Sequence, residues 1–482
     1  MRKPTLVLLL CAVSIPALAQ VTTLISFDKA NGRDPGYPAA PFVQGTNGRL
    51  YGTTAAGGAN DEGTVFEMTT AGKLNTLYSF CSQTGCSDGA VANPGLVQAL
   101  DGNLYGTTNA GGSNRGGTVF QITPAGKLTT LYNFCSVSGC ADGEFPSAGL
   151  MQAADGNLYG TTAVGGTDGT GTIFKITTAG KLTTLVSFNG TNGGNPAFGS
   201  LIQGTDENFY GTTSSGGAYT GCGNSSGCGT VFKMTRGGKL TTIYSFCALP
   251  NCADGTELFG GVVQGTDGNF YGVTAVGGAN GYGTVFKLTA AGALTTLHNF
   301  DFFPDGAYPE AAPIEGTGGN FYGTTSNGGT NGVAGTLFVI TPQGDLTTLY
   351  SFCSKADCAD GTGPFAGLIQ ATNGEFYGTT FAGGTSSNCN GGCGTAFSLS
   401  TGLTPFVETR PSSGKVGEHV ILLGNNLGGA TAVSFNGTAA TFRVVSSTEI
   451  GTTVPSEATT GTLTVTVPGG TLESNRPFYV RP

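Results

Sequence analysis

The chain alternates between short runs of apolar or β-branched residues and clusters of glycine, asparagine and aspartate. In residues 148–188, such runs at 148–152, 157–162, 171–177 and 182–188 are separated by glycine-containing turns. Runs of this length, rich in Thr, Val, Leu, Phe and Tyr, predict four β-strands joined by hairpin-type turns. No window keeps apolar residues at the i, i+3, i+4, i+7 spacing of an amphipathic helix. The pattern therefore predicts an all-β fold.

The same unit recurs along most of the chain. Its most constant phrase is Tyr-Gly-Thr-Thr, with one copy reading Tyr-Gly-Val-Thr, and consecutive copies start 51 to 61 residues apart. The copies start at Tyr51, Tyr105, Tyr159, Tyr210, Tyr271, Tyr322 and Tyr377. Four antiparallel strands in a repeat of this size are typical of β-propeller blades. Residues 20–402 are therefore predicted to form a seven-bladed β-propeller, in which the repeated tyrosines pack between blades.

The two ends of the repeat array complement each other. Residues 21–27 match the fourth strand of a blade, but no first, second or third strand precedes them. The seventh unit, in contrast, ends with a third strand at 394–400. Pairing these segments would complete the seventh blade and remove open sheet edges, which an open solenoid would not need. We therefore expect the N-terminal strand to close the last blade. Loops after second and fourth strands would then lie on one face, and the hairpins after first and third strands on the other.

The N-terminus has the features of an export signal. Residues 1–19 combine a basic start at Arg2 and Lys3, an apolar run of about ten residues and a small-residue cleavage site at Ala17-Leu18-Ala19. The run is too short to cross a bilayer, so we expect a signal peptide and a mature chain that starts at Gln20, carries no membrane span and is secreted, extracellular or at the cell surface. Loss of the two basic residues would take the formal charge from −9 to −11. This acidity argues against nucleic acid and anionic lipid as partners, because both need clustered Lys and Arg.

Cysteine usage agrees with export. Cys11 falls in the predicted signal peptide, and the other twelve cysteines form close pairs. The pairs are Cys81/Cys86, Cys135/Cys140, Cys222/Cys228, Cys247/Cys252, Cys353/Cys358 and Cys389/Cys393. An even number in an exported chain predicts disulfides. The alternative is zinc held by two neighbouring pairs, but zinc motifs typically use tighter spacing, and we expect no metal there.

Two resemblances follow from the residues. The unit Asn-Leu-Tyr-Gly-Thr-Thr, Gly-Gly, Gly-Thr-Val-Phe, Gly-Lys-Leu-Thr-Thr-Leu-Tyr-Ser-Phe, covering residues 21–400, resembles the GloVer tandem repeat of exported bacterial proteins. That resemblance implies a secreted or surface-anchored product and no settled biochemical activity. Residues 405–482 lack cysteine and contain valine-rich strands with Gly424-Asn425-Asn426-Leu427 and a closing Phe478-Tyr479-Val480. They resemble an IPT/TIG domain, which implies an immunoglobulin-like β-sandwich serving as spacer, dimer contact or adhesive arm.

Aspartates in the inter-blade loops are the candidate ligand-binding residues. They are Asp34, Asp88, Asp142, Asp254, Asp305 and Asp360, each at a similar distance before a first strand. We expect the ring to gather them near one channel mouth, where carboxylates suit calcium or sugar hydroxyls. The alternative is that each Asp-Gly only forms a turn. Calcium is the one cofactor that these residues suggest.

The candidate chemistry favours binding over catalysis. The chain has two histidines, His298 in a predicted fourth strand and His419 in the sandwich, and neither is placed as the base of a nucleophilic triad. We therefore expect a non-catalytic binding, adhesion or scaffold protein whose disulfide-stapled loops bind an extracellular glycan or protein. The alternative is a polysaccharide lyase or hydrolase with carboxylates, and a tyrosine, at the channel mouth.

Overall fold

The computed structural model describes residues 19–29, 35–92, 94–196, 198–223 and 226–482. The predicted signal peptide, apart from Ala19, and the candidate Asp34 lie outside the described residues. Among the described residues, no helix is long and apolar enough to cross a membrane.

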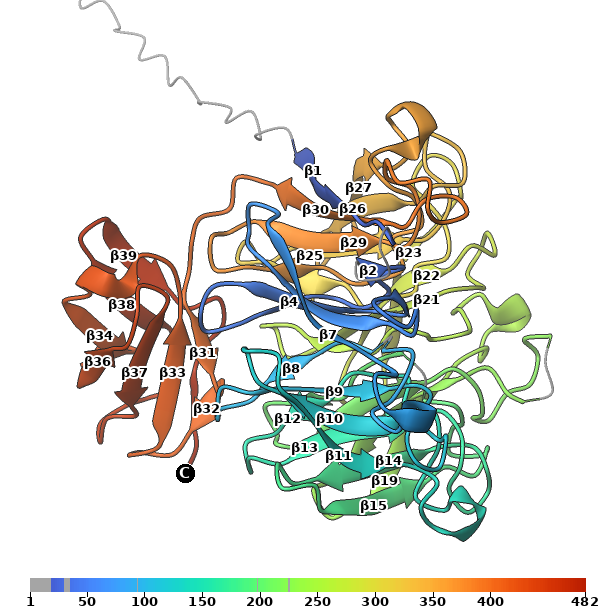
Figure 1. The fold of residues 1–482 in the computed structure, drawn as a ribbon, viewed down its shortest axis with the longest axis horizontal. Coiled ribbons are helices and arrows are strands. Elements are labelled where there is room, and N and C mark those ends of the chain that lie inside the picture. The colour runs from blue at the N-terminus through green and yellow to red at the C-terminus, as the bar shows by residue number, and fades with distance from the viewer. Residues whose placement is uncertain (1–18, 30–34, 93, 197, 224–225) are drawn as a thin grey trace, which may run out of the picture.

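Seven four-stranded antiparallel sheets make up the described part of residues 20–400 (Figure 1). Their first strands are β3 (Val43–Gln44), β8 (Val97–Gln98), β12 (Met151–Gln152), β16 (Ile202–Gln203), β20 (Val263–Gln264), β24 (Ile314–Glu315) and β28 (Ile369–Gln370). The second strands are β4 (Leu50–Thr54), β9 (Leu104–Thr108), β13 (Leu158–Thr162), β17 (Phe209–Thr213), β21 (Phe270–Thr274), β25 (Phe321–Thr325) and β29 (Phe376–Thr380). The third strands are β6 (Thr64–Met68), β10 (Thr118–Ile122), β14 (Thr172–Ile176), β18 (Thr230–Met234), β22 (Thr284–Leu288), β26 (Thr336–Ile340) and β30 (Thr395–Ser400). The fourth strands are β7 (Leu74–Ser79), β11 (Leu128–Asn133), β15 (Leu182–Ser187), β19 (Leu240–Ser245), β23 (Leu294–Asn299), β27 (Leu346–Ser351) and β1 (Gln20–Ser26). A small extra ladder joins β2 (Pro35–Gly36) to β5 (Ala56–Gly57).

The N-terminal strand lies where the sequence places it. β1 pairs antiparallel with β30, from Gln20 opposite Ser400 to Ser26 opposite Thr395. The seventh sheet therefore takes three strands from the end of the repeat array and one from its beginning, which covers the edge of β30.

The repeated Tyr-Gly-Thr-Thr is a packing motif. In the third blade, Tyr159 lies within the apolar layer against the fourth blade, with its ring stacked on Phe209 at 4.3 Å between centroids. Gly160 faces the ring of Phe174, and a Cβ there would lie 2.6 Å from that ring, so only glycine fits. Thr161 donates to the carbonyl of Pro196 in the next blade, and Thr162 bonds Thr172 across the sheet. The hydrophobic core therefore lies between successive blades rather than inside one.

A glutamine or glutamate at the end of each first strand links neighbouring blades. Gln98 accepts a hydrogen bond from the Thr46 amide of the preceding blade at 2.9 Å, and the same contact recurs around the molecule through Gln152, Gln203, Gln264, Glu315 and Gln370. Gln44 of the first blade accepts from the Thr372 amide of the last blade at 2.9 Å. These contacts, here called the latches, connect every consecutive pair of sheets, including the last with the first.

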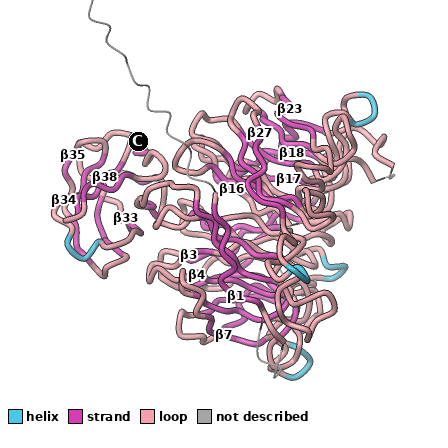
Figure 2. Tube along the Cα trace, turned by 90° about the horizontal axis from the view of Figure 1, so that it is seen from above, coloured by secondary structure: helices cyan, strands magenta, loops and turns pink. Residues whose placement is uncertain are grey.

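The C-terminal domain is a two-sheet sandwich. One sheet contains β31 (Glu408–Arg410), β33 (His419–Leu423), β37 (Glu449–Thr453) and β36 (Phe442–Val444), and the other contains β35 (Thr438–Ala439), β34 (Ala432–Phe435), β38 (Leu463–Val467) and β39 (Gly470–Glu473). β32 (Ser413–Gly414) pairs parallel with β40 (Tyr479–Val480), and η6 (Leu427–Gly429) is a short 3-10 turn. The domain lies against one side of the propeller, opposite the 3-10 turns of the inter-blade loops (Figures 1 and 2).

Candidate functional site

Four inter-blade loops each contain a disulfide and a one-turn 3-10 helix, and we call them the stapled loops. Their bonds are Cys81–Cys86, Cys135–Cys140, Cys247–Cys252 and Cys353–Cys358, and their turns are η2 (Thr84–Cys86), η3 (Ser138–Cys140), η4 (Pro250–Cys252) and η5 (Ala356–Cys358). Cys222–Cys228 and Cys389–Cys393 close loops between second and third strands. All twelve predicted partners are paired as expected. In the fourth blade, the sulfur atoms of Cys228, Cys247 and Cys252 lie within 4.8 Å of one another, but as disulfides they lack the thiolate charge that zinc needs.

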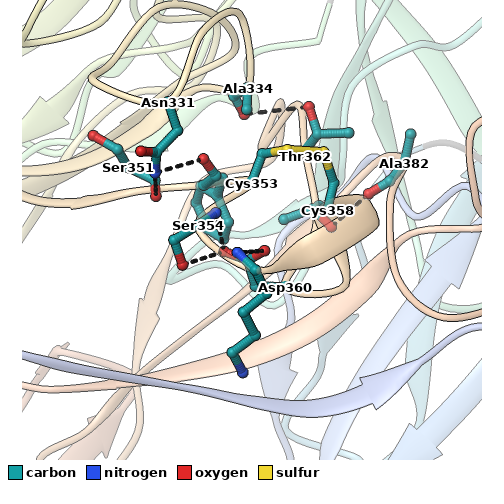
Figure 3. The surroundings of a disulfide bond; sticks show 12 residues. Asn331, Ala334, Ser351, Cys353, Ser354, Cys358, Asp360, Thr362 and Ala382 are labelled. Atoms are coloured by element: carbon teal, nitrogen blue, oxygen red, sulfur yellow. Dashed lines mark hydrogen bonds between the residues drawn. A yellow bond between two sulfur atoms is a disulfide. The ribbon is translucent and has the colours of Figure 1, made fainter.

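The candidate aspartates of the stapled loops are buried and hold their own loops. Asp360 accepts hydrogen bonds from the Tyr350 hydroxyl at 2.7 Å, from the Ser354 amide and hydroxyl at 2.9 Å, and from the Lys355 amide at 3.2 Å (Figure 3). Asp88 and Asp142 repeat all four bonds, and Asp254 repeats three. Each carboxylate therefore ties the loop to the fourth strand of its blade.

Whether these aspartates form a ligand site near the channel mouth stays a prediction. The structure shows that each carboxylate of the stapled loops contacts the fourth strand of the preceding blade, at the sheet edge opposite the first strand. A cation or a sugar hydroxyl would have to compete with three or four donors that already bind each carboxylate. Asp305 belongs to a loop without cysteines and accepts instead from His298 at 2.6 Å and from the Asp301 amide at 3.0 Å.

The charge states of these groups favour the same structural role. Burial alone raises the pKa of Asp142, but hydrogen bonds from the Ser136 and Val137 amides and from Tyr132 outweigh it, and the net pKa lies below the ordinary value. Burial and the neighbouring carboxylate raise the pKa of Tyr350 to about 12. At neutral pH Asp142 is therefore an ionised acceptor and Tyr350 a neutral donor.

On the opposite face, six of the seven repeat tyrosines, all but Tyr322, form a hydrogen bond with the hairpin that precedes them. Tyr210 donates to Asp206 and Tyr271 donates to Asp267, both at 2.8 Å, and a lysine salt-bridges each of these aspartates. Burial and the adjacent carboxylate raise the pKa of Tyr210 and of Tyr271 to about 12. These tyrosines are packing groups, as predicted, and their hydroxyl groups stay protonated at neutral pH.

A cavity of about 890 Å³ lies between the first strands of the propeller and the C-terminal domain. Propeller residues that line it include Gln98, Gln152, Gln203 and Gln264, whose amides already form the latches. Across from them lie Arg410, Arg476 and Arg481 of the sandwich. Arg410 donates to the Gln44 carbonyl at 2.8 Å and Arg476 donates to the Gln264 carbonyl at 3.0 Å. The cavity is therefore bounded by groups that dock the two domains.

Sequence reasoning overlooked the latches and these arginines. The signal for the latches was present, because glutamine ends six of the seven first strands and glutamate the other. No comparable repetition marks the arginines, since they lie in the C-terminal domain.

Solved structures resemble the chain in fold at low sequence identity. One, described as a novel fungal alcohol oxidase with catalytic diversity among the AA5 family, in complex with copper, is 13% identical over 97% of this chain and 100% of that chain, with a TM-score of 0.54. The periplasmic gluconolactonase of Pseudomonas aeruginosa is 15% identical over 70% of this chain and 95% of that chain, with a TM-score of 0.41. A search of curated proteins found no significant match. At 13% identity the likeness to the oxidase shows the fold alone.

The residues present do not fit a copper centre at the interdomain cavity. Copper sites in proteins favour imidazole and thiolate ligands. Neither histidine lines this cavity: His298 lies in β23, bonded to Asp305, and His419 lies in β33 of the sandwich. All cysteines of the described residues are in disulfides. We therefore derive no chemistry for this chain from the copper of that oxidase.

The family comparison agrees with the repeat architecture. The model of the Gloeobacter/Verrucomicrobia repeat matches residues 14–224 and 218–442, and the model of the IPT/TIG domain matches residues 406–480. These matches cover the seven sheets and the sandwich described above. The chain belongs to the Gloeobacter/Verrucomicrobia repeat family and ends in an IPT/TIG domain.

Proposed function

We propose that the protein is a secreted, non-catalytic binding scaffold that presents its stapled loops to an extracellular glycan or protein. One observation carries the proposal: the acidic and phenolic groups repeated in the blades are engaged in holding loops and hairpins in place. Loops held on a rigid frame are where binding residues concentrate in folds of this kind. Six disulfides suit an oxidising, extracytoplasmic location.

The alternative of a polysaccharide lyase or hydrolase needs different groups. Such enzymes use carboxylates or a tyrosine that exchange protons with substrate at the working pH. Asp142 and Asp360 have lowered pKa values and bonded oxygens, which makes them poor proton donors. Tyr78 and Tyr350 have pKa values of about 12, which makes them poor bases at neutral pH. These features favour binding without turnover.

The test measures binding and turnover in the same tube. Purified protein is incubated with soluble and insoluble polysaccharides, with and without calcium, and both retained protein and newly released chain ends are counted. We expect retention without release. Release of ends that Asp142→Asn or Asp360→Asn abolishes would refute the non-catalytic assignment. Retention that requires calcium would instead assign a cation to the binding face.

A further inference from the structure

The seven blades are not equivalent, and one departure lies between the third and fourth. The loop that joins these blades covers fourteen residues, 188–201, where the preceding stapled loop covers seventeen, 134–150, and its described residues contain neither a disulfide nor a 3-10 turn. The loop between β17 and β18 covers 214–229, against 163–171 between β13 and β14. A short loop beside a long one leaves a hollow of about 560 Å³, here called the blade 3–4 hollow.

The lining of this hollow is neutral and polar. Its lining residues in the described chain include glycines, such as Gly190 and Gly194, but no charged side chain. Asn195, Ser215 and Thr220 also line it, and within the described residues their side chains make no hydrogen bond. The hollow therefore offers neutral polar groups that have no hydrogen-bond partner within the described residues.

Exposed aromatic side chains lie on the loops around the hollow, although the ring of Phe198 also meets Phe259 of the next blade, 6.1 Å between centroids. Phe198 is 57% exposed, Tyr219 is 43% exposed and Phe145 is 37% exposed, and they account for three of the four large aromatics exposed in the described chain. Tyr219 directly precedes Thr220, and the Phe145 carbonyl accepts a hydrogen bond from the lining residue Ala163 at 3.0 Å. Aromatic faces of this kind bury the apolar faces of a ligand while nearby polar groups bond its hydroxyls.

We propose that the blade 3–4 hollow binds a short segment of a neutral carbohydrate. Its volume falls within the range of about 300–1,000 Å³ found for small-molecule sites. Uncharged hydroxyl, amide and backbone groups match sugar hydroxyls, and a charged ligand would lose water without gaining an ion pair. The site lies on the loop face and rests on the proposed function, for which it names the ligand class and the place.

The test is a titration with neutral hexasaccharides of the β-glucan, xylan, mannan and α-glucan classes, and with an oligogalacturonate as the charged comparison. We compare the wild type with Tyr219→Ala and Thr220→Val, both at exposed positions, and with the control Phe303→Ala, an exposed aromatic outside the hollow. Loss of one stacking contact is expected to weaken binding about tenfold for Tyr219→Ala. Thr220→Val should weaken it too, and the control should bind as the wild type does.

The outcomes separate this inference from the proposed function. Binding that both hollow variants leave unchanged, or equal competition by the oligogalacturonate, would overturn the neutral-sugar site and leave a binding scaffold with its ligand elsewhere. No binding of any neutral oligosaccharide by the wild type would also overturn the site. Release of new chain ends by the wild type would overturn the proposed function itself.

Discussion

Replacement of Asp142 by asparagine should release one stapled loop while the blade beneath it stays folded. The carboxylate accepts bonds from the Ser136 amide at 2.9 Å, the Val137 amide at 3.1 Å, and the hydroxyls of Tyr132 and Ser136 at 2.9 Å. The two hydroxyl oxygens lie 2.7 Å apart and can still hydrogen-bond each other in the variant. The hydrogen bonds lost are therefore those of the two amides. A hydrogen bond to a charged group contributes about 1.5–3 kcal/mol, so each amide should exchange about 10–100-fold faster.

The assay is hydrogen exchange of the peptide that spans 134–141, followed by mass spectrometry at neutral pH. The matched control is Asp168→Asn in the next blade, where the carboxylate is exposed and bonded only to its neighbour Thr167. Exchange of the 134–141 peptide at the wild-type rate in Asp142→Asn would refute the conclusion that this aspartate holds the loop. If hydrogen exchange of the 134–141 peptide were equally faster in both variants, the loss of one negative charge, rather than the position of the carboxylate, would explain the effect.

The same carboxylate predicts a pH dependence. The folded pKa of Asp142 lies below its ordinary value, so its stabilisation is present above the unfolded pKa of about 3.9 and is lost as pH falls through the folded value. The stability difference between the wild type and Asp142→Asn, measured by proteolysis of the loop with an acid-active protease, should therefore shrink from pH 6 towards pH 3. A difference that stays constant over this interval would contradict an ionised acceptor.

Three further predictions concern how the parts are joined. Gln44→Leu leaves the buried Thr372 amide without its acceptor and should lower the free energy of unfolding by about 1–3 kcal/mol, seen as a lower urea midpoint; an unchanged midpoint would argue against a latch at the seam. Deletion of residues 20–26 exposes the edge of β30, so size-exclusion chromatography should show self-association, and a monomer would contradict this. Arg410→Ala removes the bond to the Gln44 carbonyl and should raise the radius of gyration measured by X-ray scattering, whereas Arg443→Ala, exposed on β36, should not.

The repeat determined more of this protein than any single motif. Strands, turns and disulfide partners are local features, and each recurs in most blades. A pattern that recurs at the same position in most repeats is not a chance feature of one segment. The orphan strand at 21–27 predicted its pairing with the last repeat because a strand without partners leaves backbone groups unsatisfied. The IPT/TIG domain could be recognised for a related reason, since its strands alternate regularly over residues 405–482.

Other features depended on contacts that no local pattern reveals. Sequence spacing did not reveal that Asp88, Asp142, Asp254 and Asp360 each accept a hydrogen bond from a tyrosine of the preceding fourth strand. The latches join residues at least 49 positions apart, and Arg410 bonds a residue 366 positions away. The blade 3–4 hollow arises where one shortened loop lies beside one lengthened loop. The sequence by itself determined the repeated local structure, because neighbouring residues decide strands, turns and small disulfide loops. Only the tertiary structure decided which polar side chains hydrogen-bond within the fold and which have no such bond and can contact a ligand.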